Sequence, residues 1–209
     1  MKTPTAGIIL AAGESTRFGE PKQLLRLCGR FLLEWVLTAA LDSNLDHVVL
    51  VLGCEHERIR RSLVSTTAHP KCEILVNPDY RSGQSTSLKT GILRIQLDFP
   101  SVMFLLGDQP LVDAAFINLL MKRFAASEKP ICVPTHRGTR RNPTLFGSSF
   151  YPQLLKLAGD RGARDLIADY PHQVLAVEIP DARIFLDIDR AQDVEPIARL
   201  LKSRQPPEK

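Results

Sequence analysis

The sequence of 209 residues lacks an apolar stretch long enough to cross a membrane or to form the core of a secretory signal. The apolar residues near the N-terminus run directly into a glycine-rich loop. Internal repeats and low-complexity tracts are also absent. We therefore expect a cytoplasmic protein that has no membrane partner.

Cysteine is scarce, and its four occurrences form no C-x-x-C pair: Cys28, Cys54, Cys72 and Cys132. That spacing argues against the common zinc-binding and thiol-redox motifs. Cys132 falls within an apolar run typical of a strand, where a free thiol behaves as a small apolar side chain. We expect buried free thiols, with a disulfide or a metal site as the less favoured alternative.

Histidine offers no catalytic arrangement either. The histidines are scattered in polar surroundings, and no Ser-His-Asp or Cys-His pattern emerges from their positions. They are His47, His56, His69, His136 and His172. Surface positions are the favoured interpretation for all of them.

The composition fits an ordinary globular protein. A hydrophobic fraction of 44% and a charged fraction of 24% exclude a mostly disordered or fibrous chain. The length suits one domain, expected at 1–203, followed by a frayed tail at 204–209. The net charge of +4 comes from scattered Lys and Arg, with one cluster at Arg137, Arg140 and Arg141. This charge distribution favours small phosphorylated ligands over nucleic acid.

Short apolar runs alternate with helical patterns in the first two thirds of the chain. Candidate strands lie at 7–10, 47–53, 73–76, 102–107 and 130–134, and candidate helices at 31–42, 55–64, 85–97 and 114–126. This alternation predicts an α/β fold with a doubly wound, mostly parallel sheet and helices on both faces. Ligands of such sheets bind beyond the carboxyl ends of the strands, so the loops after 7–10 and 102–107 are the first places to look for a site.

The pattern changes after residue 134. We expect an extended or hairpin segment at 135–147, helices at 150–159 and 162–170, strands at 174–179 and 183–188, and a closing helix at 190–202. No linker separates these elements from the first part, so they are expected to extend the same sheet.

The loop LAAGESTRFGEPK, residues 10–22, follows the first candidate strand. Gly13 and Gly19 allow backbone amides to turn toward an anion, and Arg17 and Lys22 supply charged donors. The loop has neither the G-K-[ST] of a Walker A motif nor the G-x-G-x-x-G of dinucleotide-binding folds. It predicts an anion site, with a structural turn that carries two solvated cations as the alternative.

Two acidic segments could complete that site. Asp108 in GDQP follows a strand and would face the same crevice as the glycine loop. In LDID, Asp187 and Asp189 would point to the same side of a strand and repel each other unless a cation or solvent separates them. Capping of turns and helices is the alternative role for these three carboxylates.

Residues 10–22 resemble the L-A-[AG]-G-x-[SG]-x-R-[MF]-G-x-x-K signature of nucleotidyltransferases, and most closely its form in molybdenum cofactor cytidylyltransferases. Phe18 stands in place of the usual Met, which is a tolerable apolar exchange. Further motifs match in the same order, at 77–91, 105–112, 140–147, 159–166 and 186–194. Because these matches extend over nearly the whole chain, the resemblance is specific.

The resemblance implies a reaction and a cofactor. The terminal phosphate of molybdopterin would attack the α-phosphorus of CTP, and pyrophosphate would leave. Mg²⁺ needs only one or two protein carboxylates beside phosphate oxygens and water, and Asp108 and Asp187 would provide them. Asp189 would support these ligands or cap the last helix. Arg17, Lys22 and Asp108 would be the catalytic residues.

The resemblance also assigns the two substrate sites. The nucleotide would contact Leu10, Ala11, Ala12, Gly13, Asn77, Gly83, Ser87 and Asp108, and the second substrate Asn142, Asp160, Gly162 and Arg164. The related guanylyltransferases read LAGG where this chain has Ala12, and the extra methyl group favours CTP over GTP. Arg141 replaces the glycine of the usual R-G-N-P pattern, which could close the backbone approach or add a phosphate contact.

Other functions share parts of this pattern. A GTP-dependent guanylyltransferase, or a sugar-phosphate or polyol-phosphate nucleotidyltransferase, would use the same chemistry on other substrates. A glycosyltransferase has a similar sheet but usually ends a central strand in D-x-D. From a different class, a carrier could bind the molybdenum cofactor and deliver it. A client molybdoenzyme or its maturation chaperone is the expected protein partner.

Overall fold

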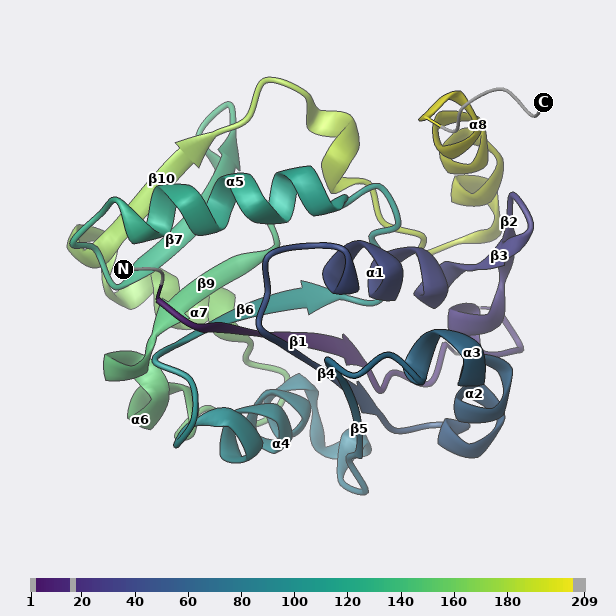
Figure 1. The fold of residues 1–209 in the computed structure, drawn as a ribbon, viewed down its shortest axis with the longest axis horizontal. Coiled ribbons are helices and arrows are strands. Elements are labelled where there is room, and N and C mark those ends of the chain that lie inside the picture. Colours follow the sequence, from purple (N-terminus) through teal and green to yellow (C-terminus); the bar gives the residue numbers. More distant parts are fainter. Residues whose placement is uncertain (1–2, 16–17, 205–209) are drawn as a thin grey trace.

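An eight-stranded sheet runs through the middle of the computed structural model, which describes residues 3–15 and 18–204 (Figure 1). Its strands are β1 (Thr5–Ala11), β4 (His47–Leu52), β5 (Cys72–Val76), β6 (Ser101–Leu106), β7 (Ile131–His136), β8 (Thr139–Arg140), β9 (Thr144–Gly147) and β10 (Val174–Glu178). A separate antiparallel ribbon joins β2 (Arg26–Leu27) to β3 (Arg30–Phe31).

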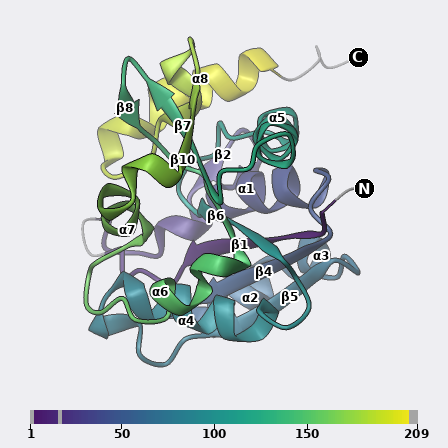
Figure 2. The same ribbon diagram turned by 90° about the vertical axis from the view of Figure 1, so that its left-hand side faces the viewer.

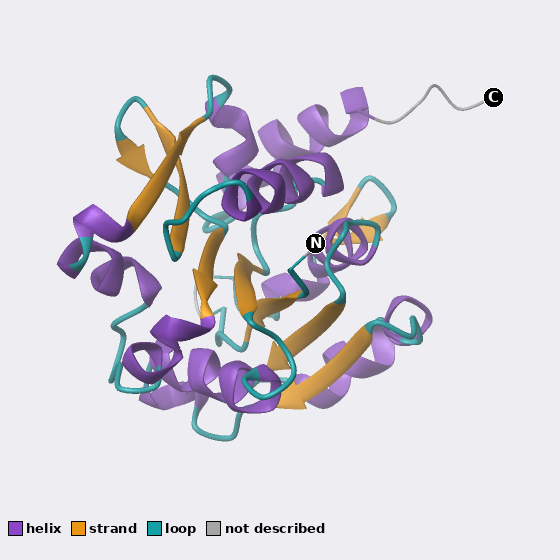
Figure 3. Cartoon of the chain, turned by 60° about the vertical axis from the view of Figure 1, so that its left-hand side comes forward, coloured by secondary structure: helices purple, strands orange, loops and turns teal. Residues whose placement is uncertain are grey.

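Helices cover both faces of the sheet, as the colours of Figure 3 show. On one face lie α1 (Leu32–Leu41) and α5 (Ala114–Ala125), and on the other α4 (Gln84–Ile95), α6 (Tyr151–Leu154) and α7 (Ala163–Asp169). The remaining helices are α2 (His56–Ser62), α3 (Val64–Thr67) and α8 (Val194–Arg204). The predicted α/β fold is confirmed.

The strand order is β10-β7-β9-β6-β1-β4-β5, with β8 paired to β7, and Figure 2 shows β7 and β10 at the edge far from β5. Strands β1, β4, β5 and β6 pair in parallel, whereas β9 runs antiparallel between β6 and β7. The chain leaves β1 toward β4 and later returns to β6 on the other side of β1. Ligands of doubly wound sheets bind at such a reversal.

The register brings the carboxyl ends of three strands to one level. Leu10 lies beside Leu106, and Ala11 lies beside Leu52. The glycine loop after β1 and the loop with Asp108 after β6 therefore start side by side. This local geometry is what the sequence predicted for them.

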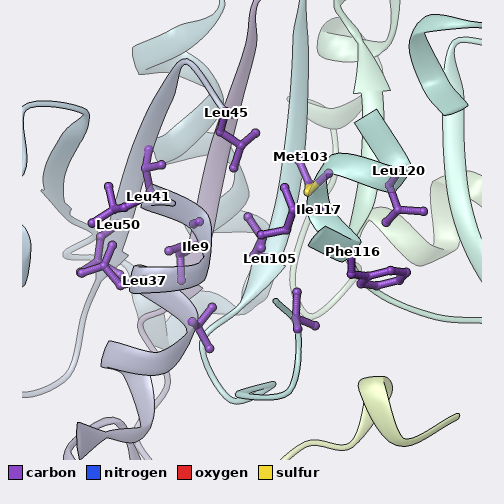
Figure 4. Packing of buried hydrophobic residues seen from close by; sticks show 14 of the residues in the cluster. Ile9, Leu37, Leu41, Leu45, Leu50, Met103, Leu105, Phe116, Ile117 and Leu120 are labelled. Carbon is purple, nitrogen blue, oxygen red and sulfur yellow. The ribbon is translucent and has the colours of Figure 1, made fainter. Parts of the chain in front are cut away.

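The core forms because strand side chains alternate between the two faces. Ile9, Met103 and Leu105 pack against α1 and α5, as Figure 4 shows, while Ile8 and Phe104 face α4. A third, smaller cluster includes Leu27 of β2 and Ile197 of α8, so α8 packs against the β2–β3 ribbon. No helix among the described residues has the length and apolar character needed to span a membrane.

The strand predicted at 183–188 is wrong. Residues Ala182–Phe185 form a short 3-10 turn, and the side chain of Asp181 accepts a hydrogen bond from the N–H of Arg183 at its start. Ile184 and Phe185 are both buried although they are consecutive, which an alternating strand would not allow. The expected helix at 150–159 is shorter than predicted and is α6, and the expected helix at 55–64 is interrupted at Leu63 and forms α2 and α3.

The four cysteines are free thiols, as expected, but among them only Cys132 is fully buried. Burial raises the pKa of Cys132 to about 12, and burial together with the charge of Glu73 raises that of Cys72 to about 11. Both thiols therefore remain protonated near neutral pH. The expectation of complete burial is wrong for Cys28, Cys54 and Cys72, which are half-buried.

Candidate active site

A pocket of about 890 Å³ opens at the carboxyl ends of β1 and β6. Most of the residues that the motifs assign to the nucleotide and to catalysis line it: Leu10, Ala11, Ala12, Gly13, Lys22, Gly83, Ser87 and Asp108. Segments separated by some 70 residues in sequence are thus brought to one cavity. Arg17 lies outside the described residues, so its predicted role stays a prediction.

The glycine loop is held through its carbonyl oxygens. The side-chain amide of Gln23 donates hydrogen bonds to the carbonyl oxygens of Ala11 at 2.9 Å and Gly13 at 3.1 Å. The amide oxygen of Gln23 accepts a hydrogen bond from the Ser15 hydroxyl at 3.1 Å. On the other side, the N–H of Cys54 donates to the carbonyl oxygen of Ala12 at 3.2 Å. Residues 11–15 of the loop are therefore held in a defined backbone shape.

Lys22 joins the two acidic segments. Its ammonium group lies 2.7 Å from Oδ2 of Asp108, 3.3 Å from Oδ1 of Asp189 and 3.1 Å from the carbonyl oxygen of Ile188. Burial alone would lower the pKa of Lys22, but the two carboxylates outweigh that effect and raise it. Lys22 therefore stays positively charged at neutral pH.

Asp108 has one carboxylate oxygen without a partner. Oδ2 pairs with Lys22, whereas Oδ1 is buried and accepts no hydrogen bond from any described residue. A buried acceptor that stays unpaired costs free energy unless a ligand supplies a donor or a cation. The arrangement is therefore suited to a bound cation.

The segment with Asp187 and Asp189 reaches the same place without forming a strand. The N–H of Ile188 donates to the carbonyl oxygen of Asp108 at 3.1 Å, which anchors the segment to the loop after β6. Asp189 pairs with Lys22 through its side chain, whereas the helical turn that follows begins after Arg190. The capping role considered for Asp189 is therefore not seen.

Asp187 carries an unfavourable charge. Burial of its carboxyl group on the protein side raises the pKa of Asp187, and the nearby charges of Asp108 and Asp189 act in the same direction. The residue as a whole is exposed, so its other side is open to solvent or a ligand. A cation between Asp108 and Asp187 would relieve this repulsion.

Replacing Asp187 with Asn should raise the melting temperature of the metal-free protein at pH 7 by about 1 to 3 °C. A raised pKa means that the folded state disfavours the carboxylate, and this cost disappears as the pH falls below the ordinary value of 3.8. The difference between variant and wild type should therefore close in acid. Thermal unfolding of both proteins in EDTA at pH 7 and pH 3.5 measures this difference. Equal melting temperatures of variant and wild type at pH 7 would contradict the repulsion at Asp187.

Asn77 does not line the pocket. The residue is 2% exposed, and its amide donates to the hydroxyls of Thr86 at 2.8 Å and Ser87 at 2.9 Å. These bonds fix the first turn of α4, which carries Ser87 into the pocket wall. The prediction that Asn77 reaches the base is therefore replaced by an indirect, supporting position.

Gly83 occupies a position that only glycine can fill. Its φ is +105°, and a Cβ there would lie 2.2 Å from the carbonyl carbon of Gly159. The N–H of Ser85 donates to the Gly159 oxygen at 3.1 Å. The start of α4 and the loop at 159–162 are therefore packed backbone to backbone.

Gly83→Ala should lower the melting temperature by about 5 °C or more, because the left-handed φ and the backbone clash both oppose a methyl group. Gly138→Ala is the matched control, since Gly138 has a φ of +74° with no atom within 4 Å of the added Cβ. Thermal unfolding of both variants separates the clash from the φ strain. Equal losses in the two variants would mean that the contact with Gly159 is unimportant.

A second pocket of about 290 Å³ adjoins the first. Its lining includes the residues assigned to the second substrate, Asn142, Asp160, Gly162 and Arg164, and it shares Leu10, Gln84, Leu106 and Asp160 with the larger pocket. A Cβ at position 162 would lie 2.7 Å from Oε1 of Gln84, so the flexible end of that side chain would have to move aside. The structure therefore brings the predicted acceptor residues together beside the predicted nucleotide residues.

Arg141 lines neither of these two pockets. Its side chain is exposed, and its N–H donates to the carbonyl oxygen of Pro134 at 2.8 Å. The residue does not have a positive φ, so an L side chain is accommodated without strain. The replacement of the usual glycine therefore leaves the pocket open.

Some residues of the site gave no signal in the sequence. Gln23 follows the motif at 10–22 and Gln84 lies within the motif at 77–91, but neither was assigned a role, because their contacts depend on how distant loops meet. Arg81 and Glu14 form an ion pair of 2.8 Å, and both line the larger pocket. Their separation of 67 positions hides this pairing from any local pattern.

Comparison with known proteins agrees with this geometry. The family model for the MobA-like NTP transferase domain matches residues 7–174. The purine catabolism protein PucB of Bacillus subtilis is 30% identical over 207 residues, covering 96% of this chain and 100% of its own length. The molybdenum cofactor cytidylyltransferase of Escherichia coli is 29% identical over 190 residues, covering 89% of this chain and 91% of its own.

The crystal structure of Rv0371c from Mycobacterium tuberculosis matches with a TM-score of 0.82 and 25% identity, over 95% of this chain and 99% of that one. The same protein in complex with manganese matches with a TM-score of 0.78 and 24% identity, over 94% and 99%. The family match spans most of the chain and all the residues that line the two pockets. This chain therefore belongs to the family of MobA-like NTP transferase domains and is a nucleotidyltransferase.

Proposed function

We propose that this nucleotidyltransferase transfers a cytidylyl group from CTP to the terminal phosphate of molybdopterin that carries molybdenum, and releases pyrophosphate. The observation that supports this most is the pair of adjoining pockets that share Asp160. The motif residues for the nucleotide line one pocket, and those for the acceptor line the other. The Escherichia coli relative, named a molybdenum cofactor cytidylyltransferase, supports the same substrates.

The acidic residues present fit a magnesium ion. Among residues 3–15 and 18–204, no cluster of three or more His, Cys, Asp or Glu side chains could enclose a metal. Mg²⁺ does not require one, because it takes one or two carboxylates together with phosphate oxygens and water. We assign Asp108 and Asp187 as these two ligands. Oδ1 of Asp108 has no hydrogen-bond partner among the described residues, and burial and the nearby carboxylates raise the pKa of Asp187. When bound, the ion would neutralise charge on the reacting phosphates.

The protein side chains contribute mainly position and charge. The acceptor phosphate is already an anion, so no strong general base is required, and the lack of a histidine in the pocket is no obstacle. Lys22 can break its contacts with the carboxylates of Asp108 and Asp189. Its positive charge would then offset the negative charge that develops on the departing pyrophosphate. The pocket holds the two substrates side by side, which lowers the entropic part of the barrier.

Ala12 supports a preference for the smaller pyrimidine base. Its side chain is 6% exposed in the wall of the nucleotide pocket, and its carbonyl oxygen is fixed by Cys54. A loop held this firmly has little freedom to retreat from a purine. One methyl group discriminates by about 1 to 3 kcal/mol, so we propose CTP as the preferred substrate and GTP as a weaker one.

The product would pass to a molybdoenzyme or to its maturation chaperone in the cytoplasm. The Bacillus relative is named for purine catabolism, so an enzyme that oxidises purines is the first client to examine. Co-purification of such an enzyme with this protein tests the partnership. A carrier that binds the cofactor without turnover is the alternative from a different class.

The test is pyrophosphate release from purified protein with Mg²⁺, molybdenum-loaded molybdopterin and each nucleoside triphosphate in turn. We expect release with CTP at least about ten times faster than with GTP. Preference for GTP would overturn the role of Ala12. Release only with a sugar phosphate or polyol phosphate as acceptor would overturn the acceptor, and no release with any acceptor would favour the carrier.

A further inference from the structure

Gln23 is a buried polar residue of the nucleotide pocket that has no assigned role. It is 4% exposed, lines the pocket, and uses both the nitrogen and the oxygen of its amide within the glycine loop. Buried amides that merely stabilise a fold can bond to any nearby backbone. The three bonds of Gln23 all go to the short segment that is expected to meet the phosphates.

These bonds set the direction of two peptide groups. In a trans peptide, the carbonyl of one residue and the N–H of the next point in opposite directions. With the carbonyls of Ala11 and Gly13 held by Gln23, the N–H groups of Ala12 and Glu14 point away from it. No backbone hydrogen bond to a described residue uses either N–H group.

We propose that Gln23 is a positioning residue, which presets the N–H groups of Ala12 and Glu14 to bind phosphate oxygens of the nucleoside triphosphate. The inference rests on the proposed function only in requiring a triphosphate in this pocket. A loop ordered before binding avoids part of the cost of ordering it afterwards. Backbone N–H groups that lie close together in a loop can form an anion-binding concavity.

The chemistry of the side chain explains why glutamine suits this position. Two carbonyl oxygens must be met by two donors, and an amide nitrogen carries two. Glu would direct a carboxylate at both carbonyl oxygens and repel them. Met has a similar length but offers no donor. The carbonyl of Gly13 and the N–H of Glu14 would then be free to rotate, whereas the Ala11 peptide would keep only the restraint of the β1–β4 pairing.

Gln23→Met tests the proposal through equilibrium binding to the full-length protein. The four nucleoside triphosphates are first titrated into the wild type with Mg²⁺, and the best-bound one is compared with its own nucleoside by calorimetry and NMR titration. We expect the variant to bind the triphosphate at least about tenfold more weakly, whereas nucleoside affinity should change less than about threefold.

The nucleoside arm separates positioning from general support of the pocket. Equal losses for triphosphate and nucleoside would mean that Gln23 only maintains pocket shape, and would overturn the proposal. Unchanged triphosphate affinity would overturn it as well. Gln153→Met on α6 is the matched control, since Gln153 lines neither of the two substrate pockets, and both affinities should stay at the wild-type values.

Two further variants keep the proposal testable if Gln23→Met does not fold. Gln23→Glu retains the shape of the side chain, and Ser15→Ala removes only the bond to the amide oxygen of Gln23. Both should weaken triphosphate binding selectively, Ser15→Ala by a smaller factor. A folded variant of either kind with wild-type triphosphate affinity would contradict the role of Gln23.

The same titrations distinguish this inference from the proposed function. Tightest binding of GTP by the wild type would overturn the choice of base and leave the test of Gln23 intact. Failure of the wild type to bind any of the four triphosphates would overturn both.

Discussion

Replacing Asp108 with Asn should lower the rate of nucleotidyl transfer by about a thousandfold or more while the protein stays folded. The amide has nearly the same shape as the carboxylate and keeps an oxygen that can accept from Lys22. It loses the negative charge that pairs with Lys22 and that would hold a divalent cation at Oδ1. The structural cost should be small because Lys22 keeps its contacts with Asp189 and with the carbonyl oxygen of Ile188.

Initial rates of pyrophosphate release, together with circular dichroism, measure this effect. Asp98→Asn is the control, because Asp98 forms an exposed ion pair with Arg94 and lines neither of the two pockets. This variant should retain full activity. A folded Asp108→Asn protein that keeps more than about a tenth of the wild-type rate would show that Asp108 is not a metal ligand.

Lys22→Met should reduce kcat/KM by about a hundredfold and, without nucleotide, should tighten the binding of Mn²⁺. The two effects have one cause. The ammonium group of Lys22 contacts Asp108, Asp189 and the carbonyl oxygen of Ile188 in the free protein, so an incoming cation must compete with it for Asp108. Removing the ammonium group frees these oxygens but also removes a positive charge from the phosphates.

Electron paramagnetic resonance of free Mn²⁺ gives the affinity, and steady-state kinetics give kcat/KM. Lys122→Met, on the exposed side of α5, should leave both at wild-type values. Weaker Mn²⁺ binding by Lys22→Met would show that Lys22 organises the carboxylates for the metal instead of competing with it. That outcome would contradict the proposal that the Lys22 ammonium group and the metal ion compete for Asp108.

Much of the site could be predicted because its parts follow strands. Gly13 and Asp108 come directly after apolar runs that pair in parallel, and parallel strands place such loops at one edge. Gly83 was predicted as a nucleotide contact and lines the pocket, although the reason for its glycine, the close approach of Gly159, depends on a contact between distant loops.

The failures share a physical origin. Residues 183–188 are apolar enough for a strand, but hydrogen bonds from Gln109 to Phe185 and from Ile188 to Asp108 bind this segment to a loop. Asn77 follows a strand end as predicted, yet its amide is taken up by Thr86 and Ser87. In each case a tertiary hydrogen bond decided the outcome, and such bonds leave no periodicity in a sequence.

The backbone contact between Ser85 and Gly159 makes the first turn of α4 a wall common to both pockets. A ligand in one pocket that orders the first turn of α4 should therefore also order the residues of that turn that line the other pocket. We expect the two substrates to bind with positive cooperativity, and thermodynamics requires that gain to be the same whichever substrate binds first.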